Sequence, residues 1–181
     1  NDIFRSSLVR FVHAYRRGGD QEPMIYADRS PRIDVAAEFR DLMRADTRVL
    51  PAFPGLHRHL ARSPARDATM SDVIYWSKEK VAGKAVISIT HLAIERRPDT
   101  SPVAYAAGSK QLYASHYFDA SLGLTIVIRN PVDPASAYVT YINRSRVDAF
   151  EGLFGGVARR LVRSRAPGTL TGFLTRLQRR L

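Results

Sequence analysis

Cysteine is absent from the 181 residues of this chain, and its absence narrows the possible chemistry. Without thiols there can be no disulfide bond, no thiolate nucleophile and no cysteine-bound zinc. The chain also lacks any run of about 18 apolar residues, the length that a membrane-spanning helix requires. Hydrophobic residues still make up 45% of the chain, so it can bury a core. We therefore expect a globular domain that folds without disulfides.

Motifs with a specific catalytic or nucleotide-binding meaning are also missing. The chain contains no Gly-x-Ser-x-Gly turn, no Walker-type phosphate loop and no Gly-x-Gly-x-x-Gly. Ser115 and His116 are adjacent, but neighbouring residues of a strand point to opposite faces and cannot act as a nucleophile and its base. The sequence therefore predicts no cofactor and no bound metal.

Acidic residues are few compared with basic ones. The chain has 28 Lys and Arg against 17 Asp and Glu, which gives a net charge of +11. Such an excess favours an anionic membrane surface or an acidic protein as partner. Nucleic acid is less favoured, because no strand interleaves basic and aromatic residues on one face. This balance favours a periplasmic or membrane-peripheral place in a bacterium.

Helical spacing of apolar residues predicts three helices in the first third of the chain. The first spans about 2–17 and ends before Gly18 and Gly19. The second spans about 33–45, and a short third helix carries Leu56 and Leu60. We read residues 1–62 as a helical segment that packs on the same domain as the rest.

Runs rich in β-branched and aromatic residues predict an antiparallel sheet after this segment. The runs are 72–77, 85–94, 109–118, 124–129 and 137–146. Short loops join the last three runs, as in a meander of antiparallel strands. The expected fold class is α+β, with five or six antiparallel strands packed by the N-terminal helices and a long C-terminal helix.

The C-terminal helix is predicted from an apolar seam that steps by three and four residues: Val147, Phe150, Phe154, Val157 and Leu161. We assign 63–165 to the sheet and this helix, and 166–181 to a basic amphipathic helix. Residues 152–181 contain no Asp or Glu, and an anionic surface is predicted to meet a set of their arginines: Arg159, Arg160, Arg163, Arg176, Arg179 and Arg180.

A twisted antiparallel sheet followed by a long amphipathic helix resembles the helix-grip superfamily, which includes START lipid-transfer domains and polyketide cyclase-like proteins. The resemblance covers roughly residues 72–165 and rests on the order of elements. Members of the superfamily place a strand before their short helices, and here only Ile25 and Tyr26 offer one. The resemblance implies an apolar cavity between sheet and helix, and binding of a ligand there.

The first functional hypothesis is therefore non-enzymatic binding of a lipid-like, apolar or amphipathic ligand near an anionic membrane. The predicted ligand contacts are aromatic, apolar and basic residues of the sheet and the terminal helix: Trp76, Ile89, His91, Tyr113, Tyr117, Arg144, Phe150 and Phe154. The alternative is an enzyme of cyclase or hydrolase type that uses His91, His116 and Tyr113. A second alternative is a basic module that binds nucleic acid or protein.

Six histidine, lysine and arginine positions have a plain structural interpretation. His57 and His59 are interpreted as solvated surface, because residues two apart on a helix point away from each other. Lys110 is interpreted as an edge residue that protects the sheet from aggregation, with a catalytic role as the alternative if it is buried. His91 is expected to be half-buried and bonded to a backbone carbonyl, and Arg144 with its neighbour Arg146 to pair with Asp148 or Glu151.

Overall fold

The computed structural model describes residues 2–21, 24–26, 32–62, 70–81, 84–115 and 117–147. Contacts divide the chain into two compact units, residues 1–146 and 147–181, and the fold described here is that of the first. The two predicted C-terminal helices lie outside the described residues. Within the part that is described, no helix combines the length and apolar character needed to cross a bilayer.

Three α-helices form in the N-terminal part, as predicted from apolar spacing, together with two short 3₁₀ turns that were not predicted. Their bounds are Asp2–Gly18 for α1, Gly19–Gln21 for η1, Val35–Ala45 for α2, Leu50–Ala52 for η2 and Pro54–Arg62 for α3. The Asp34 side chain caps α2 by accepting a hydrogen bond from the Ala37 amide at 3.0 Å. Between α1 and α2, the two-residue strands β1 (Ile25–Tyr26) and β2 (Ile33–Asp34) pair antiparallel, so Ile25 and Tyr26 do form a strand.

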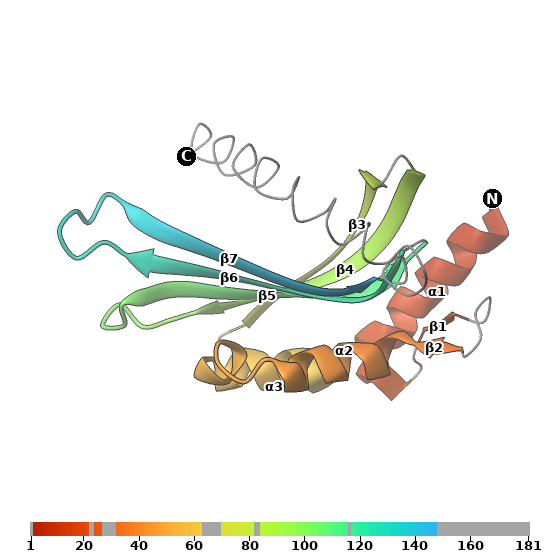
Figure 1. Cartoon of the computed structure of the whole chain (residues 1–181), viewed down its shortest axis with the longest axis horizontal. Helices are drawn as coiled ribbons and strands as arrows, with labels where there is room; N and C mark the ends of the chain where they lie inside the picture. The colour runs from red at the N-terminus through yellow and green to blue at the C-terminus, as the bar shows by residue number, and fades with distance from the viewer. Residues whose placement is uncertain are drawn as a thin grey trace, which may run out of the picture. The chain divides into compact units, whose positions relative to one another are not determined.

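The main sheet has five antiparallel strands in the order of the sequence. Figure 1 shows them as a meander, with α2 and α3 against one face. The bounds are Met70–Val81 for β3, Lys84–Arg96 for β4, Val103–Ala114 for β5, Phe118–Arg129 for β6 and Ala137–Val147 for β7. The α+β class and the five-stranded antiparallel sheet are confirmed. The predicted run 109–118 is wrong in its bounds, because β5 ends at Ala114 and Phe118 already belongs to β6.

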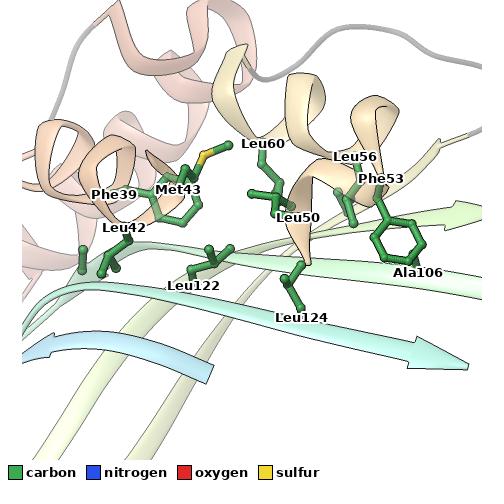
Figure 2. Packing of buried hydrophobic residues seen from close by; sticks show 12 residues of the cluster. Phe39, Leu42, Met43, Leu50, Phe53, Leu56, Leu60, Ala106, Leu122 and Leu124 are labelled. Carbon is green, nitrogen blue, oxygen red and sulfur yellow. The ribbon is translucent and has the colours of Figure 1, made fainter. Parts of the chain in front are cut away.

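The core lies between α2, α3 and the inner face of the sheet. Figure 2 shows aromatic and aliphatic side chains of the helices facing Ala106, Leu122 and Leu124 of the strands. Phe39, Leu50, Leu56 and Leu60 are fully buried, with no exposed surface. Gly108 of β5 allows this close packing, because a Cβ there would lie 2.5 Å from Leu60 Cδ1 and 3.3 Å from Leu56 Cδ1. The small strand residues thus set how closely α3 approaches.

A β-bulge interrupts the pairing of β4 with β5 between Ile89 and Thr90. Thr90 pairs with Gln111 and Ile89 pairs with Tyr113, so Leu112 is the extra residue on β5. Strict alternation therefore assigns the wrong face to residues beyond the bulge. This places Tyr113 beside Ile89 on the helix-covered face, where its ring centroid lies 6.0 Å from that of Phe4.

Candidate functional site

Two imidazoles and one carboxylate meet under the helices, and each comes from a different element. His59 of α3 and His91 of β4 both place Nε2 against Oδ1 of Asp72 on β3, at 2.7 and 2.6 Å. The rings of His59 and His91 are almost fully buried, whereas the Asp72 side chain is 35% exposed. We call these three residues the His–Asp–His cluster.

Tyr15 of α1 extends the cluster on its inner side. Its hydroxyl lies 2.9 Å from His91 Nδ1, and its side chain is buried. In a neutral His91 whose proton is on Nε2, that nitrogen donates to Asp72 and Nδ1 accepts from the Tyr15 hydroxyl. The Nδ1 atom of His59 is buried and has no hydrogen-bond partner among the described residues. His91 is therefore held through both nitrogens, but His59 through one.

Burial and hydrogen bonding act in opposite directions on this cluster. Burial works to raise the pKa of Asp72, but hydrogen bonds from His91 and His59 outweigh it and hold that pKa below its ordinary value of 3.8. For His91, burial lowers the pKa below the ordinary 6.5, and Asp72 offsets only part of this effect. Near neutral pH the cluster consequently holds an ionised carboxylate and a neutral His91.

The directions of these two pKa shifts predict how the free energy of unfolding responds to acid, in a buffer that contains a metal chelator. Below pH 6.5 the unfolded chain protonates His91, while the folded chain does so only at lower pH. The unfolded state then binds more protons, so the free energy of unfolding falls as pH drops, by up to about 1.4 kcal/mol per pH unit. The contribution of Asp72 follows only below pH 3.8. Lys110 and His59 also face His91 and disfavour its charged form.

The measurement is denaturant unfolding from pH 7 to pH 4, with His91→Gln as the test variant. We expect a shallower slope for His91→Gln than for the unaltered chain. His57→Gln, on the same helix as His59, is the matched control and should keep the original slope. Equal slopes for all three proteins would show that His91 titrates alike in the folded and unfolded states.

A buried ion pair lies next to the cluster. Lys110 Nζ contacts both carboxylate oxygens of Asp20 at 2.7 Å and donates to the Leu60 carbonyl at 3.3 Å. Lys110 is 1% exposed and lies on β5, the central strand of the sheet. Its interpretation as an edge residue is therefore wrong. Burial lowers the pKa of Lys110, and Asp20 counteracts part of that effect.

An apolar groove of about 720 Å³ runs between α1 and the first two strands of the sheet. Helix α1 contributes residues at helical spacing along one side: Phe4, Arg5, Leu8, Val9, Val12 and His13. Strands β3 and β4 contribute the other wall: Ile74, Tyr75, Trp76, Ile87 and Ile89. The volume falls within the range typical of small-molecule sites.

Helix α1 is fixed at both ends of this groove. The Tyr15 hydroxyl holds its C-terminal end against His91. Near its N-terminus, the ring of Phe4 contacts that of Tyr113 edge to face. Several lining side chains remain accessible to solvent, and Trp76 is 71% exposed. A large aromatic residue exposed beside an apolar hollow is typical of a binding surface.

The predicted ligand contacts are spread over several places. Trp76 and Ile89 line the groove, while Tyr113 contacts Phe4 at its end. Tyr117 has φ of 67° at the β5–β6 turn, with the Lys84 ammonium 5.9 Å from its ring centroid. The structure thus brings part of the set together close to α1, whereas the terminal helix that was expected to line the site lies outside the described residues.

The interpretation of His91 is corrected, and two arginines have partners that the sequence did not indicate. His91 bonds side chains, Asp72 and Tyr15, and is fully buried, where a half-buried ring on a backbone carbonyl was expected. The Arg144 guanidinium donates to the Ala45 carbonyl at 2.9 Å. Arg146 pairs with Glu38 of α2. These two arginines therefore attach β7 to α2, Arg146 at its first turn and Arg144 at its last residue, while their predicted pairing with Asp148 or Glu151 stays a prediction.

Several predicted residues lie outside the described part of the chain: His116, Asp148, Glu151, Phe150, Phe154, Arg159, Arg160, Arg163, Arg176, Arg179 and Arg180. The alternative of an enzyme that uses His91, His116 and Tyr113 therefore stays a prediction. Among described residues, His91 has Tyr15 and Asp72 as hydrogen-bond partners.

Sequence reasoning missed His59, Asp72 and Tyr15 as site residues. The interpretation of His59 as solvated surface is wrong, because it is 2% exposed. Helical spacing could have indicated this, since His59 follows Leu56 by three residues and shares its buried side. Strand alternation could likewise have placed Asp72 on the face of Ile74. Nothing in the local sequence indicates that α3, β3 and β4 converge.

The geometry so far consists of an apolar groove, a buried ion pair and a His–Asp–His cluster. Each is assembled from segments that are distant in the sequence, and none corresponds to a short motif. Comparison with known proteins adds no identity to this geometry: the chain matches no protein-family model, no curated protein and no solved structure.

Proposed function

We propose that the protein binds an amphipathic, lipid-like small molecule in the groove between α1 and the sheet, without transforming it. The observation that carries the proposal is the groove itself, with a volume of about 720 Å³ and mainly aliphatic and aromatic walls. A pocket of this size and composition matches those that enclose apolar ligands, with a few polar groups to orient them. An acyl chain is the ligand part that such walls would accept.

Charge on the groove indicates the nature of the polar end. Arg5 and His13 lie eight residues apart on α1, with Val9 between them, so all three follow one side of the helix. Arg5 is exposed at the groove, where its guanidinium can pair with a carboxylate or phosphate. We therefore assign the groove to an amphiphile with one anionic head group.

The overall charge of the chain supports a membrane as the source of this ligand. A net charge of +11 attracts the protein to anionic lipid surfaces, with about 1 kcal/mol for each basic residue close to the surface. The proposal includes encounter with such a surface, from which the amphiphile is taken up. Such an encounter would shorten the path to the ligand and raise the local concentration of the ligand around the protein.

Trp76 makes the proposal directly measurable, because it is the single tryptophan of the chain and lines the groove. Titration with oleate should shift its emission to shorter wavelength and saturate at one ligand per chain, since an acyl chain would displace water from the indole. Uptake from anionic vesicles loaded with oleate should be faster than from zwitterionic ones. Absence of a saturable shift would exclude this ligand class from the groove.

Matched variants on α1 test the location. Val9→Glu places a charge in the groove and should weaken oleate binding at least about tenfold, or 1.4 kcal/mol. Ile3→Glu is the control, because Ile3 is 85% exposed on the same helix and does not line the groove. Equal loss in both variants would place the ligand elsewhere.

A second pair of variants tests the head group. Arg5→Gln should weaken binding of oleate but not of oleyl alcohol, which has the same chain and no charge. Arg10→Gln on the same helix should change neither affinity, since Arg10 lies outside the groove lining. Equal effects of Arg5→Gln on both ligands would remove the anionic head group from the proposal.

A further inference from the structure

The His–Asp–His cluster has a donor set that the apolar groove does not explain. One nitrogen of His59, one of His91 and one oxygen of Asp72 all lie within 4.8 Å of one another. They reach this point from α3, β4 and β3, so the convergence is produced by the tertiary fold and not by neighbouring residues in sequence. We propose that these three residues form a binding site for a divalent transition-metal ion such as Zn²⁺.

The chemistry of the donors fits that class of ion. Two imidazole nitrogens and one carboxylate oxygen are ligands that Zn²⁺ and its first-row neighbours accept, whereas Ca²⁺ and Mg²⁺ favour oxygen alone. Three protein ligands leave one position of a tetrahedral ion for water or an exogenous ligand. The cluster is therefore the protein part of an open site, and not of a closed structural one.

Tyr15 supplies the outer contact that metal-bound histidines generally have. Its hydroxyl lies 2.9 Å from His91 Nδ1, on the side of the ring away from Asp72. A tyrosine hydroxyl can donate or accept a hydrogen bond. When Nε2 of His91 binds a metal through its lone pair, the ring proton is on Nδ1. The Tyr15 hydroxyl oxygen then accepts a hydrogen bond from that N–H group. This contact fixes the ring orientation in both states.

The distances between the donor atoms show which side chain must move when a metal ion binds. With metal–ligand bonds of about 2.0–2.1 Å, donors around a tetrahedral ion lie about 3.3 Å apart. Asp72 Oδ1 lies 2.6 and 2.7 Å from the two nitrogens, so the carboxylate must withdraw by about 0.6 Å. Asp72 can do this because its side chain is 35% exposed on β3, an edge strand of the sheet. The same exposure offers the ion a path from solvent.

His59 and His91 differ in how firmly their rings are held. Their ring centroids are 5.8 Å apart. His59 Nδ1 has no hydrogen-bond partner among the described residues, so this ring is held through Nε2 alone. Turning of the His59 ring toward the ion therefore breaks no second hydrogen bond, while His91 remains fixed by Tyr15.

The test is titration of the full chain, free of any affinity tag, with ZnCl₂ in a calorimeter and with CoCl₂ by visible absorption. We expect one ion per chain, a higher melting temperature and the intense absorption of tetrahedral Co²⁺. X-ray absorption of the zinc complex should show two imidazole ligands. A chain that binds no zinc, or a complex with fewer than two imidazoles, would overturn the proposal.

Variants separate this site from adventitious binding by other histidines. Asp72→Asn keeps the size of the side chain and should lower zinc affinity more than about a hundredfold, beyond the range typical of outer contacts. Tyr15→Phe should lower it about tenfold. His57→Gln and His13→Gln, which change histidines outside the cluster, should leave it unaltered. Equal affinity of Asp72→Asn and the unaltered chain would refute the assignment, and circular dichroism verifies that each variant is folded.

Discussion

Lys110→Met should lower the free energy of unfolding by about 3–5 kcal/mol, because it leaves the carboxylate of Asp20 partly buried without its partner. The Lys110 side chain is 2% exposed, and both oxygens of Asp20 contact its ammonium at 2.7 Å. Arg40 Nη1 remains 4.0 Å from Asp20 and compensates part of the loss, so the lower end of the range is expected. Denaturant unfolding at neutral pH measures the effect.

Two further variants serve as controls for Lys110→Met. Lys80→Met removes an exposed lysine from β3 and should change stability by less than about 0.5 kcal/mol. The double variant Asp20→Asn with Lys110→Met should be more stable than Lys110→Met alone, because no buried charge then lacks a partner. A loss below about 1 kcal/mol in Lys110→Met would mean that water reaches Asp20 in the folded state.

Phe39→Ala is expected to cost about 3–5 kcal/mol, since it removes a buried ring and leaves a cavity between α2 and the sheet. Phe39 has no exposed surface, and it belongs to the core cluster drawn in Figure 2. Its ring centroid also lies 4.9 Å from Lys110 Nζ, so the variant removes a favourable contact of the buried ammonium. Thermal and denaturant unfolding should both report the loss.

Phe4→Ala is the matched control for this variant. Phe4 is 47% exposed on α1 and lines the groove, so its removal should cost less than about 1 kcal/mol. It should instead weaken oleate binding. A large loss of stability in Phe4→Ala and a small one in Phe39→Ala would mean that α1, and not α2, covers the main core.

The two predictions concern neighbouring residues, so their effects should not add. Phe39 and Lys110 are in contact, and removal of either alters the surroundings of the other. A double-mutant cycle between Phe39→Ala and Lys110→Met should therefore give an interaction energy of at least about 0.5 kcal/mol. The ion pair and the apolar core around it are one structural unit.

Local patterns in the sequence were sufficient for the secondary structure and the fold class. The helical spacing of Val35, Phe39 and Leu42 indicated α2, and the β-branched run of 85–94 indicated β4. Short loops between strands predicted antiparallel order, because a parallel connection requires a longer crossover. These features depend on residues within a few positions of one another, which is why the sequence reveals them.

The positions of the polar side chains depended on contacts between residues that are far apart in the sequence. The bulge at Ile89 shifts Tyr113 onto the helix-covered face, and no residue near it in the sequence indicates the bulge. Lys110 pairs with Asp20 across 90 positions, so its burial could not be inferred from its neighbours on β5. The strand pattern alone instead suggested a lysine at an edge.

By itself the sequence determined an α+β chain with an antiparallel sheet, N-terminal helices and an excess of basic residues. Only the tertiary structure decided that His59, Asp72 and His91 meet, and that α1 leaves a groove beside Trp76. The reason is physical. Secondary structure follows from short-range backbone and side-chain periodicity, whereas a site of three donors requires α3, β3 and β4 to pack at one fixed spacing, set by the whole core.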